Sequence, residues 1–76
     1  MNSAEDAVYR FLVWMEKELD ANRAVNWQQL ENFGWKDEWN FSDALGGLWQ
    51  KGLVKLKQAD LIMPDEIARK KNEKMS

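Results

Sequence analysis

The stretch FSDALGGLWQKGLVKLKQ, Phe41–Gln58, changes the spacing of its apolar residues partway along. Before Gly52 these residues recur every three or four positions, which is typical of one face of a helix. After Gly52 the sequence alternates between apolar residues and lysine, as a half-buried strand does. Gly52 itself suits the left-handed conformation that ends many helices. The pattern predicts a helix over residues 39–51 and a strand over 53–57.

Two adjacent glycines, Gly46 and Gly47, lie inside this predicted helix. A glycine in a helix interior costs about 0.5–1 kcal/mol relative to alanine. A domain of 76 residues buries little surface and has little stability to spare. Two interpretations remain open. Either the first helix, Trp39 or Trp49 crosses so closely that no Cβ fits, or the glycines form an exposed, flat seat for another molecule.

An amphipathic helix is predicted over residues 4–21. Its apolar stripe consists of Ala4, Ala7, Val8, Phe11, Leu12, Met15 and Leu19. Ser3 is the expected N-cap, with Asp6 as its capping-box partner three residues later. Asn22 is suited to the left-handed conformation just beyond the helix.

A short second helix is predicted over residues 27–33. Asn26 is the expected N-cap, Gln29 completes a capping box, and Gly34 ends the helix. The third helix, over 39–51, follows after a short connection that offers several residues suited to capping its start.

The C-terminal part of the sequence indicates a hairpin followed by a tail. Residues 61–63 form the expected antiparallel partner of the strand over 53–57, and Pro64 ends that strand and opens a short last helix. We expect one domain over residues 1–68, followed by a basic, flexible tail over 69–76.

Three helices followed by a β-hairpin resemble the winged-helix family. The resemblance covers roughly residues 4–63 and is carried by ALGGLWQKGLVKL, Ala44–Leu56, which looks like the end of a recognition helix passing into the first wing strand. It implies an α+β, mostly α fold: a three-helix winged-helix domain with a C-terminal two-stranded hairpin. It does not fix the function, because winged helices bind DNA and also proteins, and a fold alone does not determine activity.

The charges are distributed unevenly along the chain, whose net charge is −2. Residues 1–50 carry nine acidic and four basic residues, whereas residues 51–76 carry four acidic and seven basic residues. The outward face of the third helix lacks arginine and lysine, the side chains that most often contact DNA. This favours a regulatory or adaptor protein that docks on a protein partner, or on a second copy of itself. The candidate docking residues are Trp39, Asn40, Asp43, Gly46, Gly47, Trp49 and Gln50.

A small DNA-binding transcriptional regulator is the alternative. Asn40 and Ser42 would then contact bases, while Lys51, Lys55 and Lys57 would contact phosphates together with the basic tail. Lys55 and Lys57 have a second interpretation, because lysines on an exposed strand protect a small sheet from aggregation.

Five tryptophans are many for a chain of this size. Most are expected to fill the core of a small domain. One or two are expected to be exposed as anchors of an interface, where tryptophan is enriched.

Histidine and cysteine are both absent. The chain therefore lacks the commonest general base, the commonest metal ligand and any thiol nucleophile, so we expect no enzyme, no cofactor, no metal and no small-molecule substrate. No apolar run approaches the ~20 residues that span a bilayer, and the polar face of the first helix is acidic, opposite to what anionic lipids attract. With no signal peptide in the acidic N-terminal stretch, a cytoplasmic protein without membrane contact is expected.

Overall fold

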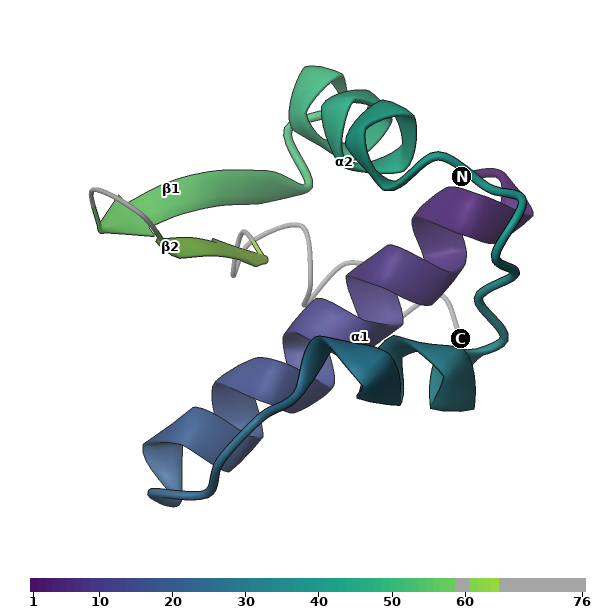
Figure 1. The fold of residues 1–76 in the computed structure, drawn as a ribbon. Helices are drawn as coiled ribbons and strands as arrows, with labels where there is room; N and C mark the ends of the chain where they lie inside the picture. The colour runs from purple at the N-terminus through teal and green to yellow at the C-terminus, as the bar shows by residue number, and fades with distance from the viewer. Residues whose placement is uncertain (59–60, 65–76) are drawn as a thin grey trace.

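A computed structural model of the chain describes residues 1–58 and 61–64, with side chains described for residues 1–55. This part of the chain is mostly helical (Figure 1). Its elements, in order, are α1 (Ser3–Asp20), the 3-10 helix η1 (Trp27–Phe33), α2 (Phe41–Gln50), β1 (Val54–Gln58) and β2 (Leu61–Pro64). The prediction of three helical segments, one after another along the chain, is confirmed.

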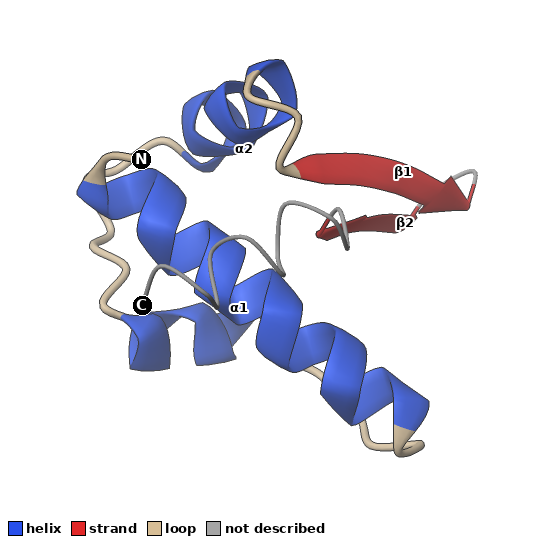
Figure 2. Cartoon of the chain, turned by 180° about the vertical axis from the view of Figure 1, so that it is seen from behind, coloured by secondary structure: helices blue, strands red, loops and turns tan. Residues whose placement is uncertain are grey.

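Helix α1 is the central element, because it contacts η1, α2 and β2. Figures 1 and 2 show α2 beside the N-terminal half of α1, with η1 on another side of the same helix. The chain leaves α2 and enters β1, whose pairing with β2 brings the chain back to α1.

The start of α1 lies one residue earlier than predicted. Asn2, and not Ser3, is the N-cap: its side chain accepts a hydrogen bond from the Glu5 N–H at 2.8 Å, and Glu5 Oε1 accepts one from the Asn2 N–H at 3.0 Å. This capping box replaces the predicted pair of Ser3 and Asp6. Glutamate is the usual third residue of such a box because it is long enough to reach back to the cap.

Each helix is followed by the residue that was expected there, and that residue adopts the left-handed backbone conformation. Asn22 follows α1 with a φ of 59°, Gly34 follows η1 with a φ of 86°, and Gly52 follows α2 with a φ of 71°. The Asn26 capping box of η1 is also present, although this segment is a 3-10 helix and not an α-helix.

Helix α2 is slightly shorter than predicted. It begins after Asn40, whose side chain accepts a hydrogen bond from the Asp43 N–H at 3.0 Å, and its C-cap is Lys51. The Leu53 N–H donates to the Leu48 carbonyl at 3.0 Å as the chain turns toward β1. This turn fixes the direction in which the chain leaves the helix.

Strands β1 and β2 pair in an antiparallel, two-stranded sheet. Lys55 lies opposite Met63 and Leu56 opposite Ile62, and the register shifts between Leu56 and Gln58. The predicted last helix after Pro64 and the predicted tail over 69–76 lie outside the described residues.

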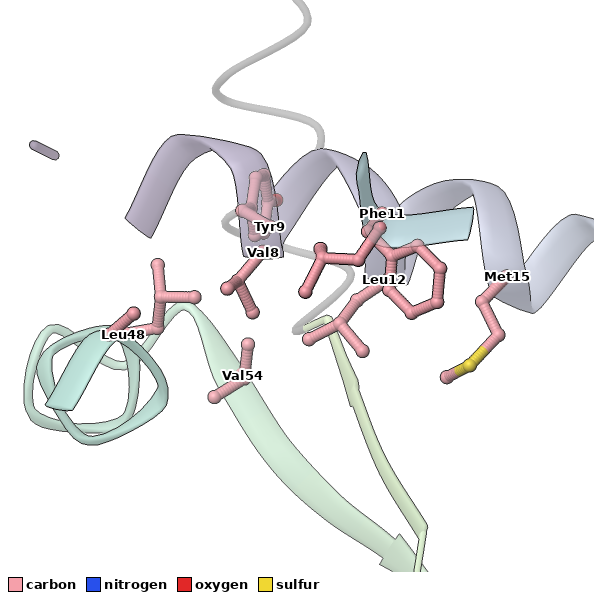
Figure 3. Close-up of a cluster of buried hydrophobic side chains, with 9 residues drawn as sticks. Val8, Tyr9, Phe11, Leu12, Met15, Leu48 and Val54 are labelled. Carbon is pink, nitrogen blue, oxygen red and sulfur yellow. The ribbon is translucent and has the colours of Figure 1, made fainter. Parts of the chain in front are cut away.

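The core is formed where α1, η1, α2 and β1 meet. Its buried residues are Val8, Tyr9, Phe11, Leu12 and Met15 from α1, Leu30 from η1, Ala44 and Leu48 from α2, and Val54 from β1. Figure 3 shows side chains of α1 pointing toward Leu48 and Val54. The prediction that Leu19 shares this buried stripe is wrong, because Leu19 is 41% exposed in the last turn of α1, which projects beyond the neighbouring elements (Figure 1).

One ion pair connects the start of α1 to the end of α2. Lys51 Nζ donates to both carboxylate oxygens of Glu5, at 2.7 and 2.8 Å. The Glu5 side chain is only 5% exposed, whereas that of Lys51 is 48% exposed. The bond from Lys51, and next the bond from the Asn2 N–H, hold the pKa of the Glu5 carboxyl below its ordinary value of 4.5, against the opposing effect of burial.

This ion pair predicts a pH dependence of stability. Because the folded-state pKa of Glu5 lies below the ordinary value of 4.5, its contribution is fully present above that pH and is lost as the pH falls through the folded-state pKa. We expect the wild-type protein to be more stable than Glu5→Gln at neutral pH, and the difference to shrink under acidic conditions. Urea denaturation across a pH series measures this difference.

Glu38→Gln is the matched control, because it removes the same acidic charge from an exposed residue that forms no ion pair with another described residue. A difference between wild type and Glu5→Gln that does not change with pH would contradict the ion pair as the source of the stabilisation.

Candidate protein-docking face

The outward side of α2 is the candidate site. Five of its residues are exposed: Ser42, Asp43, Gly46, Trp49 and Gln50. They recur at spacings of three, four and seven, so they share one face of the helix, which we call the outer face of α2. The opposite side carries Ala44 and Leu48, which are buried in the core. Packing of that side against α1 therefore presents the outer face to solvent.

The two glycines of α2 have different surroundings. A Cβ at Gly46 would meet no atom within 4 Å, so this position is open. A Cβ at Gly47 would overlap the carboxylate of Glu5, with the Glu5 Cδ at 2.9 Å. The steric interpretation is confirmed for Gly47, which makes room for a group of α1. Gly46 is exposed and open, as the second interpretation requires, and its use as a seat for another molecule stays a prediction.

Trp49 is the large apolar side chain of this face. It is 50% exposed and contacts no other aromatic ring among the described residues. The other four tryptophans pack against one another or against Phe11, Phe33 and Phe41, with ring centroids 5.3–6.0 Å apart. Trp49 is therefore set apart from the aromatic cluster that the other four tryptophans form. None of these four is fully buried, so the prediction that most tryptophans fill the core is wrong: they pack around it.

Trp39 and Asn40 lie at the approach to α2 and have structural contacts of their own. Trp39 is half-buried against Trp35, with ring centroids 5.4 Å apart, and Lys36 Nζ lies 5.8 Å from its ring centroid. The Asn40 side chain caps α2. These two predicted docking residues flank the outer face and do not form part of it.

The residues proposed for DNA are scattered. Ser42 lies on the outer face, and Lys55 is exposed on β1. Lys51 is held by Glu5, and the side chain of Lys57 lies outside the described residues. The structure therefore brings together no group of free cations among these residues.

The free charges around α2 are acidic. Asp37, Glu38 and Asp43 are exposed, and none of them forms an ion pair with another described residue. Of the two neighbouring cations, Lys51 is paired with Glu5, and Lys36 lies over the ring of Trp39 and keeps its charge, which leaves a net negative charge. The face therefore has the sign that attracts a cationic partner.

An open groove of about 450 Å³ lies beside the start of α1 and was not predicted. Arg10 lines it, but its guanidinium already donates to Asp6 at 2.9 Å and to the Phe33 carbonyl at 2.8 Å. A binding pocket needs polar groups that converge on a ligand. Arg10 connects α1 to η1 through the Phe33 carbonyl, and the Asn2 side chain caps α1, so these polar groups already serve the fold.

The surroundings of two residues, Glu5 and Trp27, do not follow from the sequence pattern. Glu5 was not assigned a role, because its partner Lys51 lies 46 residues away and no local pattern connects them. Trp27 is 57% exposed, although it also packs on Phe11 and Phe41. The capping box of η1 was a local signal that placed Trp27 at the first turn, where one side faces solvent.

In the part of the chain that the structure describes, no helix is long and apolar enough to cross a membrane. Within the same residues, no group of three acidic side chains gathers in a way that could hold a metal ion. Comparison with models of protein families, with curated proteins and with solved structures found no match.

The contrast between the two glycines gives a prediction. Gly46→Ala should stabilise the protein by about 0.5–1 kcal/mol, because alanine favours the helix and the added methyl group meets open space. Gly47→Ala should lower the midpoint of thermal unfolding, because the Glu5 carboxylate that must move is held by Lys51 and by the Asn2 N–H, and the loss of these bonds outweighs the same gain in helix propensity. Thermal melts of both variants measure this contrast. If Gly47→Ala raised the melting temperature as Gly46→Ala does, the packing of Glu5 against Gly47 would be refuted.

Proposed function

We propose that the chain is a small, non-catalytic winged-helix binding module, a regulatory or adaptor protein that docks on a protein partner through the outer face of α2. The order α1, η1, α2, β1 and β2 supports the winged-helix assignment, with α2 in the place of the recognition helix and β1 and β2 in the place of the wing. The left-handed turn at Gly52 supports it further.

The observation that carries the proposal is Trp49, half exposed one turn away from the open Gly46. Tryptophan is among the residues that contribute most to protein interfaces. A position without a side chain lets a partner approach the helix closely. An exposed indole beside such a position supports a protein surface as the ligand.

Duplex DNA is the second candidate, because Lys55 is exposed on β1 and the sequence after it is basic. Affinity for DNA depends on cations that neutralise phosphates. The outer face of α2 has none, and Lys51 is engaged by Glu5. These observations favour the protein partner.

The test of the docking face compares two exposed tryptophans. Partners captured from the native host by the wild-type chain are identified and purified, and their affinity for Trp49→Ala and Trp27→Ala is measured by calorimetry. We expect Trp49→Ala to weaken binding by about 30-fold or more, the effect of losing an interface hot spot of ~2 kcal/mol.

Trp27→Ala is the control, since Trp27 is exposed to a similar extent, 57% against 50% for Trp49, and lies on η1. Because Trp27 also packs on Phe11 and Phe41, a thermal melt first checks that this variant is folded, and Trp27→Phe, which keeps an aromatic ring at that contact, replaces it if it is not. Equal affinity of the wild-type chain and Trp49→Ala would refute docking through the outer face of α2.

A second prediction concerns DNA. We expect the isolated chain to bind labelled duplexes only nonspecifically at physiological salt, with Kd values of about 10⁻⁴–10⁻⁶ M or weaker. Fluorescence anisotropy across a salt series measures this, with Lys55→Glu and Lys57→Glu as comparison variants. Submicromolar, sequence-dependent binding that both substitutions abolish would make the DNA-binding regulator the better assignment.

A further inference from the structure

We infer that the partner presents a basic segment to the outer face of α2, with an arginine side chain lying across Gly46 between Trp49 and Asp43. The inference rests on the proposed function and specifies its ligand. The ligand is a cationic protein segment, which fits both the geometry and the charges of the outer face.

The geometry provides a strip that fits a long, thin side chain. Asp43 lies three residues before Gly46 and Trp49 lies three residues after it, so both are its neighbours on one helix face. At a rise of 1.5 Å per residue, they are separated by about 9 Å along the helix axis. No atom occupies the space in which a Cβ of Gly46 would lie, so the strip between an indole and a carboxylate is flat.

The charges favour a cation at this strip. The Asp43 carboxylate is exposed and has no ion-pair partner among the described residues. Asp37 and Glu38 add acidic charge at the approach to α2, and both are exposed. Of the cations closest in sequence, Lys51 is paired with Glu5, whereas Lys36 lies over the ring of Trp39 and keeps its charge, so three unpaired acidic charges outnumber one cation. An arriving cation therefore meets complementary charge.

Arginine fits this arrangement better than lysine. Its planar guanidinium can stack on the face of an indole and can also donate two parallel hydrogen bonds to a carboxylate. Its aliphatic stem can pack on apolar surface while the head stays charged. A lysine ammonium is a compact charge without the planar fork. Trp49 and Asp43 lie on either side of the open Gly46, and together they favour arginine over lysine.

The test uses a defined peptide as the probe. The full ¹⁵N-labelled chain is titrated with a 12-residue, alanine-based helical peptide that carries two arginines four residues apart, and with matched peptides that carry lysine or glutamine at the same positions. We expect the arginine peptide to shift the Gly46 amide and Trp49 indole signals, to bind more tightly than the lysine peptide, and to bind about tenfold more tightly than the glutamine peptide.

Three variants of the chain complete the test. Asp43→Asn and Gly46→Leu should each weaken binding of the arginine peptide by about tenfold, and Gly46→Leu should remain folded because the position is open. Trp27→Ala should bind as the wild-type chain does. Equal shifts with the glutamine peptide, signals that change only elsewhere, or no shift at millimolar peptide would each overturn the inference. Shifts of the Gly46 amide by duplex DNA would overturn it as well.

The outcomes separate this inference from the proposed function. If a native partner requires Trp49 but the arginine peptide shows no preference, the inference is wrong and docking through α2 stands. If no native partner is affected by Trp49→Ala, docking through α2 is itself wrong.

Discussion

The ion pair between Glu5 and Lys51 is the constraint on which the placement of α2 depends. It connects the first turn of α1 to the C-cap of α2, and the buried carboxylate occupies the space beside Gly47. Removing Lys51 would leave the Glu5 carboxylate, which is only 5% exposed, without its cation, and an unpaired buried charge is costly. Together with Ala44 and Leu48 in the core, the pair determines which side of α2 faces α1, and so which side faces solvent. It also neutralises the cation nearest to the outer face.

Much of the fold could be predicted because its signals are local. Capping residues and left-handed residues such as Asn26, Gly34 and Gly52 act within a few positions of the sequence, and the helices begin and end near them. The error at the start of α1 was also local in origin. Two adjacent residues, Asn2 and Ser3, can both cap a helix, and the choice between them depended on the longer reach of Glu5.

The candidate site could be predicted only in part. Helical periodicity places Asp43, Gly46 and Trp49 on one face, and this required no knowledge of the rest of the chain. Periodicity could not separate Gly46 from Gly47, because the group that distinguishes them belongs to another helix. Contacts between residues distant in sequence carry no local pattern, so the engagement of Lys51 by Glu5 was invisible as well.

The glycines also affect how α2 holds its shape. Isolated helices shorter than ~12–15 residues are marginal in water, and α2 has 10 residues, two of them glycine. Its order therefore derives from packing of Ala44 and Leu48 in the core and from the contact with α1. Because its buried side chains belong to the core, α2 should open only when its contact with α1 opens. The amide protons of α2 would then exchange with solvent through the same opening as those of the core, and a molecule seated on its outer face would slow that exchange further.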